Sequence, residues 1–421
     1  MPEYRAPRGT ADVLPEDQPY WSYVWEAASR LCRLFDYARI DTPIFEDASL
    51  FARGVGEVTD IVQKEMYVFD DRGGQQLALF PEGTAPVCRA YLQHGMHNLP
   101  QPVRLWYWHP AFRYDRPQAG RYRQHTQLGC EAIGEEDAAA DAEIIELLWR
   151  LYEELGLSGF SLHLNSIGDR RCRPAYLEVL RQYYRDKLKR VCADCRGRFE
   201  RNPLRLLDCK QEGCQPVIAG APPFTDYLCD ECAGHFSRLR SHLDDLSIPY
   251  ALNPRLVRGL DYYTRTVFEV QPPEEGGQST VGGGGRYDGL IEELGGRPTP
   301  GTGFATGIER IVLNLKRQEV PVPDRQRPRV YVAFQVPAAR AVAFRLASDL
   351  RRAGVAAVVG MGNRSLKAQM RQADSLAAAY AAIIGQRELE NGTVALRRLA
   401  DGQQEVVPLG EVAGRLEGDP A

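Results

Sequence analysis

Residues 258–269 read RGLDYYTRTVFE, and this stretch says more about the fold and function than any other part of the chain. Strand-forming residues run from Tyr262 to Val270, so Arg258 and Asp261 lie at the mouth of a predicted strand. Charges beside aromatic rings are common in pockets, because the rings exclude water and strengthen polar contacts. Taken alone, the segment fits an amphipathic strand with buried tyrosines and solvated charges at least as well as it fits a ligand pocket.

Two glycine-rich segments follow, VGGGGRYDGL (281–290) and GTGFATGIERIVLNL (301–315). Four adjacent glycines allow a backbone to approach a ligand or a neighbouring strand, although a flexible hairpin end is the more ordinary interpretation. The second segment feeds a helix that begins near Gly307 and places Arg310 in its first turn. A cation there opposes the helix dipole at a cost of about a few tenths of a kcal/mol, which indicates that Arg310 meets an anion.

FRYDRPQAGRYRQHTQLGCE (112–131) predicts a long hairpin around Pro117 and Gly120. Arginines stand at 113, 116, 121 and 123, and strand alternation places the side chains at 121, 123, 125 and 127 on one face. Clustered arginines repel each other unless an anion such as a triphosphate or a nucleic-acid end lies between them. A solvated hairpin paired with nearby acids is the alternative.

FPEGTAP (80–86) is a shorter candidate. If the segment is extended, Glu82 and Thr84 share one face and together suit an ammonium group, with one acid for charge and one hydroxyl as acceptor. A turn or N-cap that leads into a helix is the favoured interpretation of the segment alone.

The stretch 172–246 is richer in arginine and cysteine than the segments before it, and it predicts an inserted, mostly helical module. It contains two CxxC pairs, Cys192 with Cys195 and Cys229 with Cys232, and Cys209 and Cys214 lie between them. Paired CxxC knuckles fit a tetrahedral structural Zn²⁺, so these four residues are the candidate ligands. Their separation is longer than the usual ~15–20 residues, and reduced thiols are the alternative. Four thiolates leave no open position for catalysis.

The composition limits the class of protein. With 421 residues, 44% apolar and 26% charged residues, the chain is expected to be a soluble protein of two or three domains. The sequence predicts no membrane span and no secretory signal, so a cytoplasmic location with reduced cysteines is expected. The net charge of −4 means that a nucleic-acid partner would need local basic patches.

A linker rich in proline and charge, VPVPDRQRPR (320–329), separates the rest of the chain from alternating strand and helix patterns. These patterns predict a small α/β domain with a largely parallel sheet. The expected domains are therefore 1–325, with the module at 172–246 inserted into it, and 326–421.

In their order along the chain, these segments resemble the class II aminoacyl-tRNA synthetases. TPIFE (42–46) is similar to motif 1, residues 112–131 to motif 2 and residues 301–313 to motif 3. Within that class, RGLDYYTRTVFE and GGGGRYDGL (282–290) are typical of the histidyl-tRNA synthetases. RGTADVLP (8–15) and RSLKAQMRQAD (364–374) also resemble that family, so the resemblance covers nearly the whole chain.

The resemblance implies an α+β fold: a class II antiparallel-sheet catalytic core with a mostly helical insertion, and a C-terminal α/β anticodon-binding domain. It implies activation of L-histidine by ATP with Mg²⁺, release of pyrophosphate, and transfer of the histidyl group to the 3′ end of tRNA(His). A homodimer that shares the motif 1 strand is also implied. Phosphoryl chemistry of this kind requires in-line positioning and cations at the phosphate.

The resemblance further implies individual roles. Arg113 and Arg258 are the catalytic residues that grip the α-phosphate. The residues expected to bind ATP are Arg113, Arg121, His125 and Arg310. The residues expected to bind histidine are Glu82, Gly83, Thr84, Arg113, Gln127, Glu131, Arg258, Tyr262, Tyr263 and Tyr287. Glu82, Thr84 and Gln127 would hold the amino group, while Glu131 and Tyr263 would pair the two imidazole nitrogens. Arg116 and Gln118 are the candidates for the acceptor end of tRNA.

Three residues depart from the family pattern. His125 replaces the usual phenylalanine that stacks on adenine, and brings less apolar area and a pH-sensitive charge. Asp115 replaces a glutamate and is one methylene shorter. Phe80 replaces an arginine, so one positive charge near the pocket is missing.

Two other functions were weighed against this one. The synthetase-like regulatory subunit of ATP phosphoribosyltransferase lacks the anticodon domain and loses histidine-site residues, whereas Arg258, Tyr262 and Tyr263 are present here. A zinc-stabilised nucleic-acid-binding protein would explain the cysteines and arginines, but not the combination of Glu82, Glu131 and Tyr263.

Overall fold

The structure is a computed structural model that describes residues 4–56, 59, 61–116, 120–273, 280–323 and 329–417. The chain divides into two compact units, Met1–Pro323 and Asp324–Ala421. No helix among the described residues is long and apolar enough to cross a membrane.

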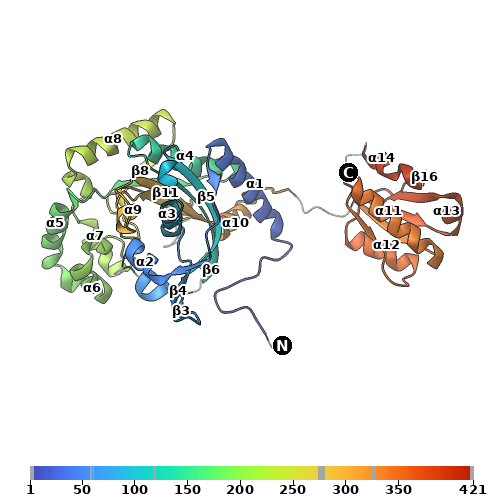
Figure 1. Ribbon diagram of the computed structural model, residues 1–421, viewed down its shortest axis with the longest axis horizontal. Helices are drawn as coiled ribbons and strands as arrows, with labels where there is room; N and C mark the ends of the chain where they lie inside the picture. The colour runs from blue at the N-terminus through green and yellow to red at the C-terminus, as the bar shows by residue number, and fades with distance from the viewer. Residues whose placement is uncertain are drawn as a thin grey trace. The chain divides into compact units, whose positions relative to one another are not determined.

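The first unit is built on an eight-stranded sheet (Figure 1). In spatial order its strands are β1 (Ala38–Arg39), β5 (Val103–Phe112), β6 (Gln124–Ile133), β11 (Gly301–Gly307), β10 (Gly282–Arg286), β9 (Thr264–Gln271), β7 (Ser161–Ser166) and β8 (Tyr250–Leu252). The inner strands from β5 to β7 pair antiparallel, and one parallel pair closes each edge. The predicted hairpin is β5–β6, while β9 begins at Thr264, after the two tyrosines.

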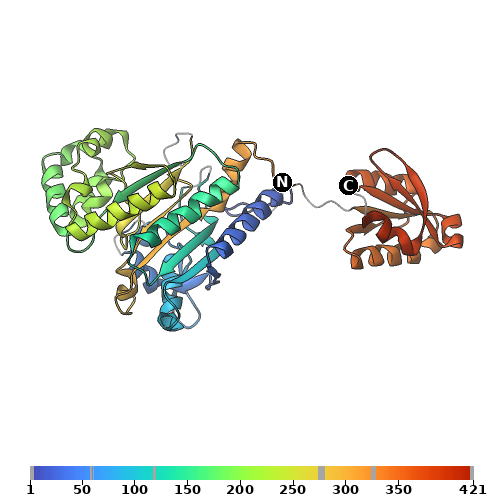
Figure 2. The ribbon, with the colours of Figure 1, turned by 90° about the horizontal axis from the view of Figure 1, so that it is seen from above.

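Side chains alternate across this sheet, as the period of two requires. Trp106, Leu128 and Cys130 enter one core, which is covered by α1 (Gln18–Leu34), α4 (Ala138–Glu154), α8 (Asp230–Asp245) and α10 (Ile308–Arg317). Figure 2 shows α1, α4 and α8 side by side across this face. Tyr107 points to the opposite face, where the catalytic candidates gather.

The opposite face is covered by short elements: α2 (Ala48–Val55), α3 (Thr84–Gln93), α9 (Leu290–Glu293) and the small sheet of β2 (Phe45–Asp47), β4 (Gln76–Leu79) and β3 (Val68–Asp70). Pro43 lies between β1 and β2 and outside both strands, because its ring removes a ladder donor. The covering elements leave the centre of the sheet accessible.

The glycine run is not a flexible hairpin end, because it forms the central strand β10. A Cβ on Gly284 would lie 1.9 Å from the carbonyl oxygen of Gly303, so the backbones of β10 and β11 approach more closely than any side chain allows. Arg286 anchors the strand through a fully buried ion pair with Asp141 of α4 (3.0 Å). The run therefore makes a rigid floor.

The insertion module contains α5 (Arg173–Arg185), α6 (Ala193–Arg201), α7 (Gln215–Ala219) and α8, with short 3₁₀ turns between them. All residues from 172 to 246 are described, and none is in a strand, so the prediction of a mostly helical insertion is confirmed. Figure 1 shows α5, α6 and α7 grouped at one side of the sheet.

The second unit holds a five-stranded sheet in the order β13 (Ala357–Val359), β12 (Val330–Phe334), β14 (Tyr380–Ile384), β15 (Thr393–Arg398), β16 (Gln404–Pro408). Its helices are α11 (Arg340–Arg352), α12 (Leu366–Ser375), α13 (Gln386–Asn391) and α14 (Val412–Glu417). Only the pairings of β12 with β13 and β14 are parallel, so the expectation of a largely parallel sheet holds for half of it. Residues 324–328 of the predicted linker lie outside the described residues.

Candidate active site

A cavity of about 240 Å³ opens over the accessible face of the large sheet. The sequence-predicted residues that line it are Glu82, Gly83, Thr84, Arg113, Arg121, His125, Gln127, Arg258, Tyr262, Tyr263 and Arg310. The first and last of them, Glu82 and Arg310, are 228 positions apart in the sequence, and the fold brings them to one place. We call this the active-site cavity.

Four arginines, at 113, 121, 258 and 310, line the cavity together with the acids Glu65, Glu82, Asp115 and Glu309. The guanidinium of Arg113 donates to the carbonyl of Pro81 (2.8 Å), and that of Arg310 donates to the carbonyl of Gly120 (2.9 Å). Burial lowers the pKa of Arg310 from its ordinary value, and repulsion from Arg121, Arg113 and Arg258 lowers it further. An anion such as a triphosphate would relieve this repulsion.

Arg258 is held by Glu269, which the sequence analysis quoted but gave no role. The two side chains form an ion pair and are mostly buried. Burial would raise the pKa of Glu269, but the adjacent Arg258 and a hydrogen bond from Thr280 (2.9 Å) keep it below its ordinary value. The Nε of Arg258 is buried and finds no hydrogen-bond partner within the described parts of the chain. Arg258 therefore keeps one donor that the described residues do not satisfy.

Glu82 has two functions in the cavity wall. Its carboxylate accepts hydrogen bonds from the backbone N–H groups of Thr84 (3.0 Å) and Ala85 (2.9 Å), so it caps the start of α3. The prediction of a cap that leads into a helix is correct, and the extended alternative is wrong. The hydroxyl of Tyr262 also donates to Glu82 (3.2 Å). Burial raises the pKa of this carboxyl, and these three donors oppose the rise.

Gln127 supplies an acceptor without a partner. Its Oε1 atom is buried and has no hydrogen-bond partner among the residues that the structure describes. A buried carbonyl in this state costs about 1–3 kcal/mol unless a ligand donates to it. Because Gln127 lines the same cavity as Glu82 and Thr84, the three residues can bind a common ammonium group.

Glu131 and Tyr287 do not line the cavity and lie one layer beneath it. The carboxyl group of Glu131 accepts hydrogen bonds from the hydroxyls of Tyr287 (2.7 Å) and Thr84 (2.9 Å). Burial raises the pKa of Glu131 to about 8, against the opposing effect of these donors. In the free protein this carboxyl is therefore largely protonated at neutral pH.

Tyr107 is a cavity residue that the sequence analysis missed. Its ring lies between two glycines: a Cβ on either Gly83 or Gly129 would lie 2.1 Å from its Cζ atom. Its hydroxyl lies 3.4 Å from Glu131. Tyr107 pairs with Gly129 in the register of β5 and β6, so strand alternation combined with the correct register could have identified it.

His125 does not carry the pH-sensitive charge that the sequence suggested. Burial lowers its pKa to about 3, and the nearby Arg113 and Arg310 contribute to the decrease. The imidazole is therefore neutral at physiological pH and presents a flat, uncharged ring to the cavity.

The other two departures have local partners. Asp115 forms an ion pair with Arg121 (3.1 Å), so it restrains a cavity arginine. Phe80 is fully buried and stacks on His109, with ring centroids 5.4 Å apart. The prediction that Arg123 shares the face of Arg121 is not met, because β6 begins only at Gln124. Arg123 instead lies over the ring of Tyr114, 3.9 Å from its centroid.

The two residues predicted to contact tRNA lie in the loop between β5 and β6. Arg116 is exposed, as a contact with a large polyanion requires. Gln118 lies outside the described residues.

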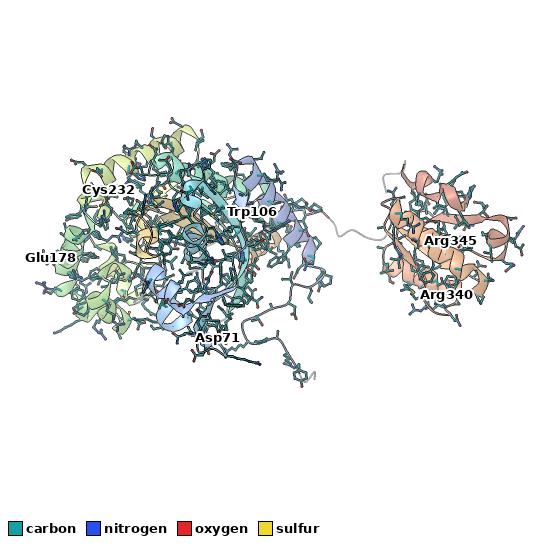
Figure 3. The ribbon with its side chains drawn as sticks, in the orientation of Figure 1. Asp71, Trp106, Glu178, Cys232, Arg340 and Arg345 are labelled. Carbon is teal, nitrogen blue, oxygen red and sulfur yellow. The ribbon has the colours of Figure 1, made fainter. Side chains whose placement is uncertain are left out.

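The prediction of one zinc site from Cys192, Cys195, Cys229 and Cys232 is wrong in its ligand set. The two CxxC pairs belong to different clusters: Cys192 and Cys195 group with Cys209 and Cys214, whereas Cys229 and Cys232 group with Asp169 and Cys172. The cause is the helical packing of the module, since one pair begins α6 and the other begins α8. Figure 3 labels Cys232 on α8.

Two family models match the chain. The model described as histidyl-tRNA synthetase matches residues 9–171 and 199–311, and the model of an anticodon binding domain matches residues 329–418. A histidine–tRNA ligase of Dehalococcoides mccartyi is 57% identical over 97% of this chain and 98% of that protein. One of Desulforamulus reducens is 49% identical over 96% and 97%, respectively.

Solved structures lead to the same family. The apo histidyl-tRNA synthetase of Staphylococcus aureus superposes with a TM-score of 0.83 at 37% identity, covering 98% of this chain and 99% of that one. An ATP phosphoribosyltransferase regulatory subunit/histidyl-tRNA synthetase of Bacillus halodurans has a TM-score of 0.65 at 23% identity, covering 91% and 98%, and so shares the fold alone. From the cavity, the two matched models and the full-length relatives, the chain belongs to the histidyl-tRNA synthetase family.

Proposed function

We propose that this protein is a histidine–tRNA ligase, which activates L-histidine with ATP and transfers it to the 3′ end of tRNA(His). The observation that carries the proposal is the shared cavity, which is lined both by four arginines and by the acceptors Glu82, Thr84 and Gln127. A triphosphate and an amino acid need these opposite electrostatic environments next to each other. The family membership identifies the amino acid and the nucleic acid.

In the first step, a carboxylate oxygen of histidine attacks the α-phosphorus of ATP, and pyrophosphate leaves. Arg113 and Arg258 contact the α-phosphate from the cavity wall and offset the charge that develops there. Arg121 and Arg310 hold the remaining phosphates, and His125 stacks on the adenine. Because all four guanidiniums stay charged, their contribution does not depend on a proton transfer.

Glu82, Thr84 and Gln127 bind the α-amino group, and Gly83 leaves room for the ring of Tyr107 beside them. Tyr262 positions Glu82 through its hydrogen bond. Tyr263 and Glu131 pair the imidazole nitrogens, with Tyr287 behind Glu131. For Glu131 to contact the imidazole directly, its carboxyl must give up a hydrogen bond from one of the hydroxyl groups and accept one from the imidazole N–H instead. A site built this way rejects analogues without the ring nitrogens, because its polar groups would then be left unpaired.

In the second step, a ribose hydroxyl of the terminal adenosine attacks the histidyl carbonyl, and AMP leaves. Arg116 and Gln118 contact the acceptor end, and the second unit reads the anticodon, in keeping with its matched family model. A homodimer is part of the proposal: Ile44 and Phe45 at β2 and Val68 and Phe69 at β3 are exposed apolar residues that a partner subunit would cover. The reaction is placed in the cytoplasm, where translation occurs.

Mg²⁺ belongs to the proposal as the ion that accompanies the triphosphate. The carboxylates at the cavity are already engaged: Asp115 by Arg121, and Glu309 by the N–H of Thr126 (2.8 and 3.0 Å). Burial also raises the pKa of Glu309 to about 7. Because both of these carboxylates already have partners, the residues fit an ion held mainly by phosphate oxygens and water.

The test is histidine-dependent exchange of labelled pyrophosphate into ATP. The wild-type protein is expected to exchange, and Arg258→Ala to lose at least about 100-fold, the effect of removing one preorganised donor. Arg255→Ala is the matched control, since Arg255 is an exposed arginine three positions away that contacts Ala219 in the module. Absence of exchange by the wild-type protein would reject the proposal and favour a regulatory subunit.

A further inference from the structure

We propose that the insertion module holds two structural Zn²⁺ ions. The first site is formed by Cys192, Cys195, Cys209 and Cys214, and the second by Asp169, Cys172, Cys229 and Cys232. Within each group, the ligand atoms all lie within 4.8 Å of one another. The inference is independent of the proposed function, because none of these residues lines the active-site cavity.

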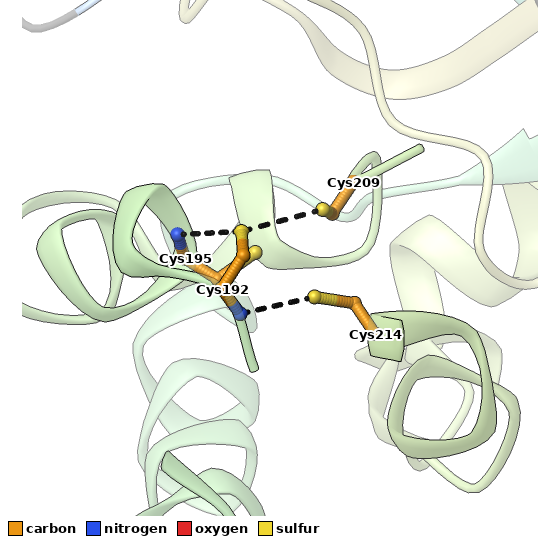
Figure 4. A group of neighbouring side chains, drawn as sticks. All are labelled: Cys192, Cys195, Cys209 and Cys214. Atoms are coloured by element: carbon orange, nitrogen blue, oxygen red, sulfur yellow. Dashed lines mark hydrogen bonds between the residues drawn. The ribbon is translucent and has the colours of Figure 1, made fainter. Parts of the chain in front are cut away.

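One sulfur–sulfur distance in the first group matches the edge of a tetrahedron. A Zn–S bond of about 2.3 Å gives a tetrahedral edge of about 3.8 Å. The Sγ atoms of Cys192 and Cys209 are 3.9 Å apart. Figure 4 shows the four side chains converging on one point from α6, the turn after residue 206 and the start of α7.

Backbone donors face the sulfurs of this group, as they do around metal-bound thiolates. The N–H of Cys195 points at the Sγ of Cys192 (3.4 Å), and the N–H of Cys192 points at the Sγ of Cys214 (3.2 Å) (Figure 4). Such N–H contacts to the sulfurs orient the ligands and stabilise their negative charge. Cys192 is also the N-cap of α6, where the helix dipole favours a thiolate.

The second group has the same spacing with one oxygen ligand. The Sγ of Cys172 lies 3.8 Å from that of Cys232 and 3.8 Å from Oδ1 of Asp169. Gly168 makes room for this sulfur: its φ is 57°, and a Cβ there would lie 2.5 Å from the Sγ of Cys172. Arg171 and Arg265 flank Asp169 at 3.3 and 3.6 Å, and would offset the net negative charge of three thiolates and a carboxylate around Zn²⁺.

Disulfides do not explain these groups, because an S–S bond is about 2.05 Å long and all ten cysteines are free. A simple pair of close thiols is seen elsewhere in the protein. Cys32 and Cys130 lie 3.8 Å apart in the core of the large sheet, and no other His, Cys, Asp or Glu among the described residues completes a site there. The module differs from this pair because four potential ligands converge at each of two places.

The two sites connect different segments of the chain. The first lies wholly within the module and links α6 to the turns before α7. The second joins the segment directly after β7, where the chain enters the module, to the start of α8, the last helix of the module. A module of short helices with few long elements is the kind of structure that metal ions stabilise.

The experiment measures zinc per chain by mass spectrometry in full-length protein purified under reducing conditions without added metal. Two zinc ions per chain are expected in the wild type and in Cys32→Ser, the matched control with a close thiol pair. Cys195→Ser and Cys232→Ser are each expected to retain one zinc. X-ray absorption at the zinc edge should then find four sulfurs in Cys232→Ser, and three sulfurs with one oxygen in Cys195→Ser.

Two outcomes overturn the proposal. One is a wild-type zinc content of one per chain or less. The other is loss of both ions in each single variant while the protein stays folded by circular dichroism. If a variant fails to fold, Co²⁺ exchanged into the wild-type protein replaces the measurement: two equivalents should bind with the visible absorption of tetrahedral thiolate sites, and fewer than two would reject the second site.

Discussion

Arg258 reaches across Gly283 of β10 to form its ion pair with Glu269 of β9. Gly283 and Glu269 are direct partners in the register of the two strands, and a Cβ on Gly283 would lie 3.0 Å from the Nη1 atom of Arg258. A glycine on the central strand is thus what allows the arginine to lie along the floor of the cavity. The carboxylate balances this buried cation while no phosphate is bound.

Removing Arg258 alone should destabilise the protein, because it leaves the Glu269 carboxylate buried without a counter-charge. We expect Arg258→Ala to lower the free energy of unfolding by about 3–5 kcal/mol, measured by urea denaturation. The double variant Arg258→Met, Glu269→Gln should regain most of this loss and still fail to exchange pyrophosphate. Recovery of exchange in the double variant would contradict the catalytic role of Arg258.

The pKa of Glu131 predicts a pH-dependent effect on stability. A carboxyl raised from an ordinary 4.5 to about 8 in the folded state stabilises the fold below 4.5, and this contribution is lost as the pH rises through 8. Glu131→Gln keeps the uncharged form, so its stability relative to wild type should increase by up to about 1.4 kcal/mol per pH unit between pH 5 and 8. Thermal unfolding across this range tests it, and a constant difference would contradict the raised pKa.

His125 should contribute to ATP binding by stacking rather than by charge. His125→Ala is expected to raise the KM for ATP about 5- to 100-fold, the usual range for the loss of one stacking partner. His125→Phe should stay within about threefold of wild type. Because burial lowers the pKa of His125 to about 3, the KM for ATP should not change with a midpoint near pH 6.5. If the KM for ATP did change near pH 6.5 in the wild type but not in His125→Phe, the imidazole would be shown to become charged.

Gly284→Ala should disrupt the sheet, because the added carbon would lie 1.9 Å from the carbonyl oxygen of Gly303. We expect a loss of more than about 3 kcal/mol in the free energy of unfolding, since backbone rather than a side chain must move. Gly414→Ala is the control. Nothing lies within 4 Å of the added carbon in α14, so this change should be neutral or stabilise by up to about 1 kcal/mol.

Arg116→Ala should separate the two steps. The exposed position predicts slower charging of tRNA, by about tenfold at low substrate concentration, with pyrophosphate exchange unchanged. Arg150→Ala, an exposed arginine of α4 that pairs with Glu146, should alter neither reaction. A matching loss of exchange in Arg116→Ala would place Arg116 in the activation step instead.

Local patterns in the sequence were sufficient for much of the fold and the cavity. The β5–β6 hairpin and the helix that follows Gly307 depend on alternation and turn residues within 20 positions. Arg310 was placed in the first turn of that helix by the same reasoning, and it lies in the cavity. The second unit, with strands and helices of ordinary length after a linker, was predictable for the same reason.

Contacts between distant segments were not predictable in this way. Glu269 is a partner of Arg258 only because β9 pairs with β10, and Tyr107 belongs to the cavity only because of its register with Gly129. The candidate zinc ligands were grouped wrongly because the repeated CxxC motif favours joining the two pairs, whereas helix packing separates them and brings Cys209 and Cys214, which are nearer in the sequence, to the first pair. Asp169 gave no signal in the sequence at all, since its role depends on the turn at Gly168.

The placement of Tyr107 between Gly83 and Gly129 limits how this pocket can change. Neither glycine can gain a side chain while the tyrosine is present, and shortening the tyrosine alone would leave a void between the two glycines. Remodelling the pocket for a different amino acid therefore requires at least two simultaneous replacements, one from large to small and one from small to large. Single substitutions, whether by natural selection or in a laboratory library, are therefore unfavourable at these positions. Libraries that change positions 83, 107 and 129 together avoid this problem.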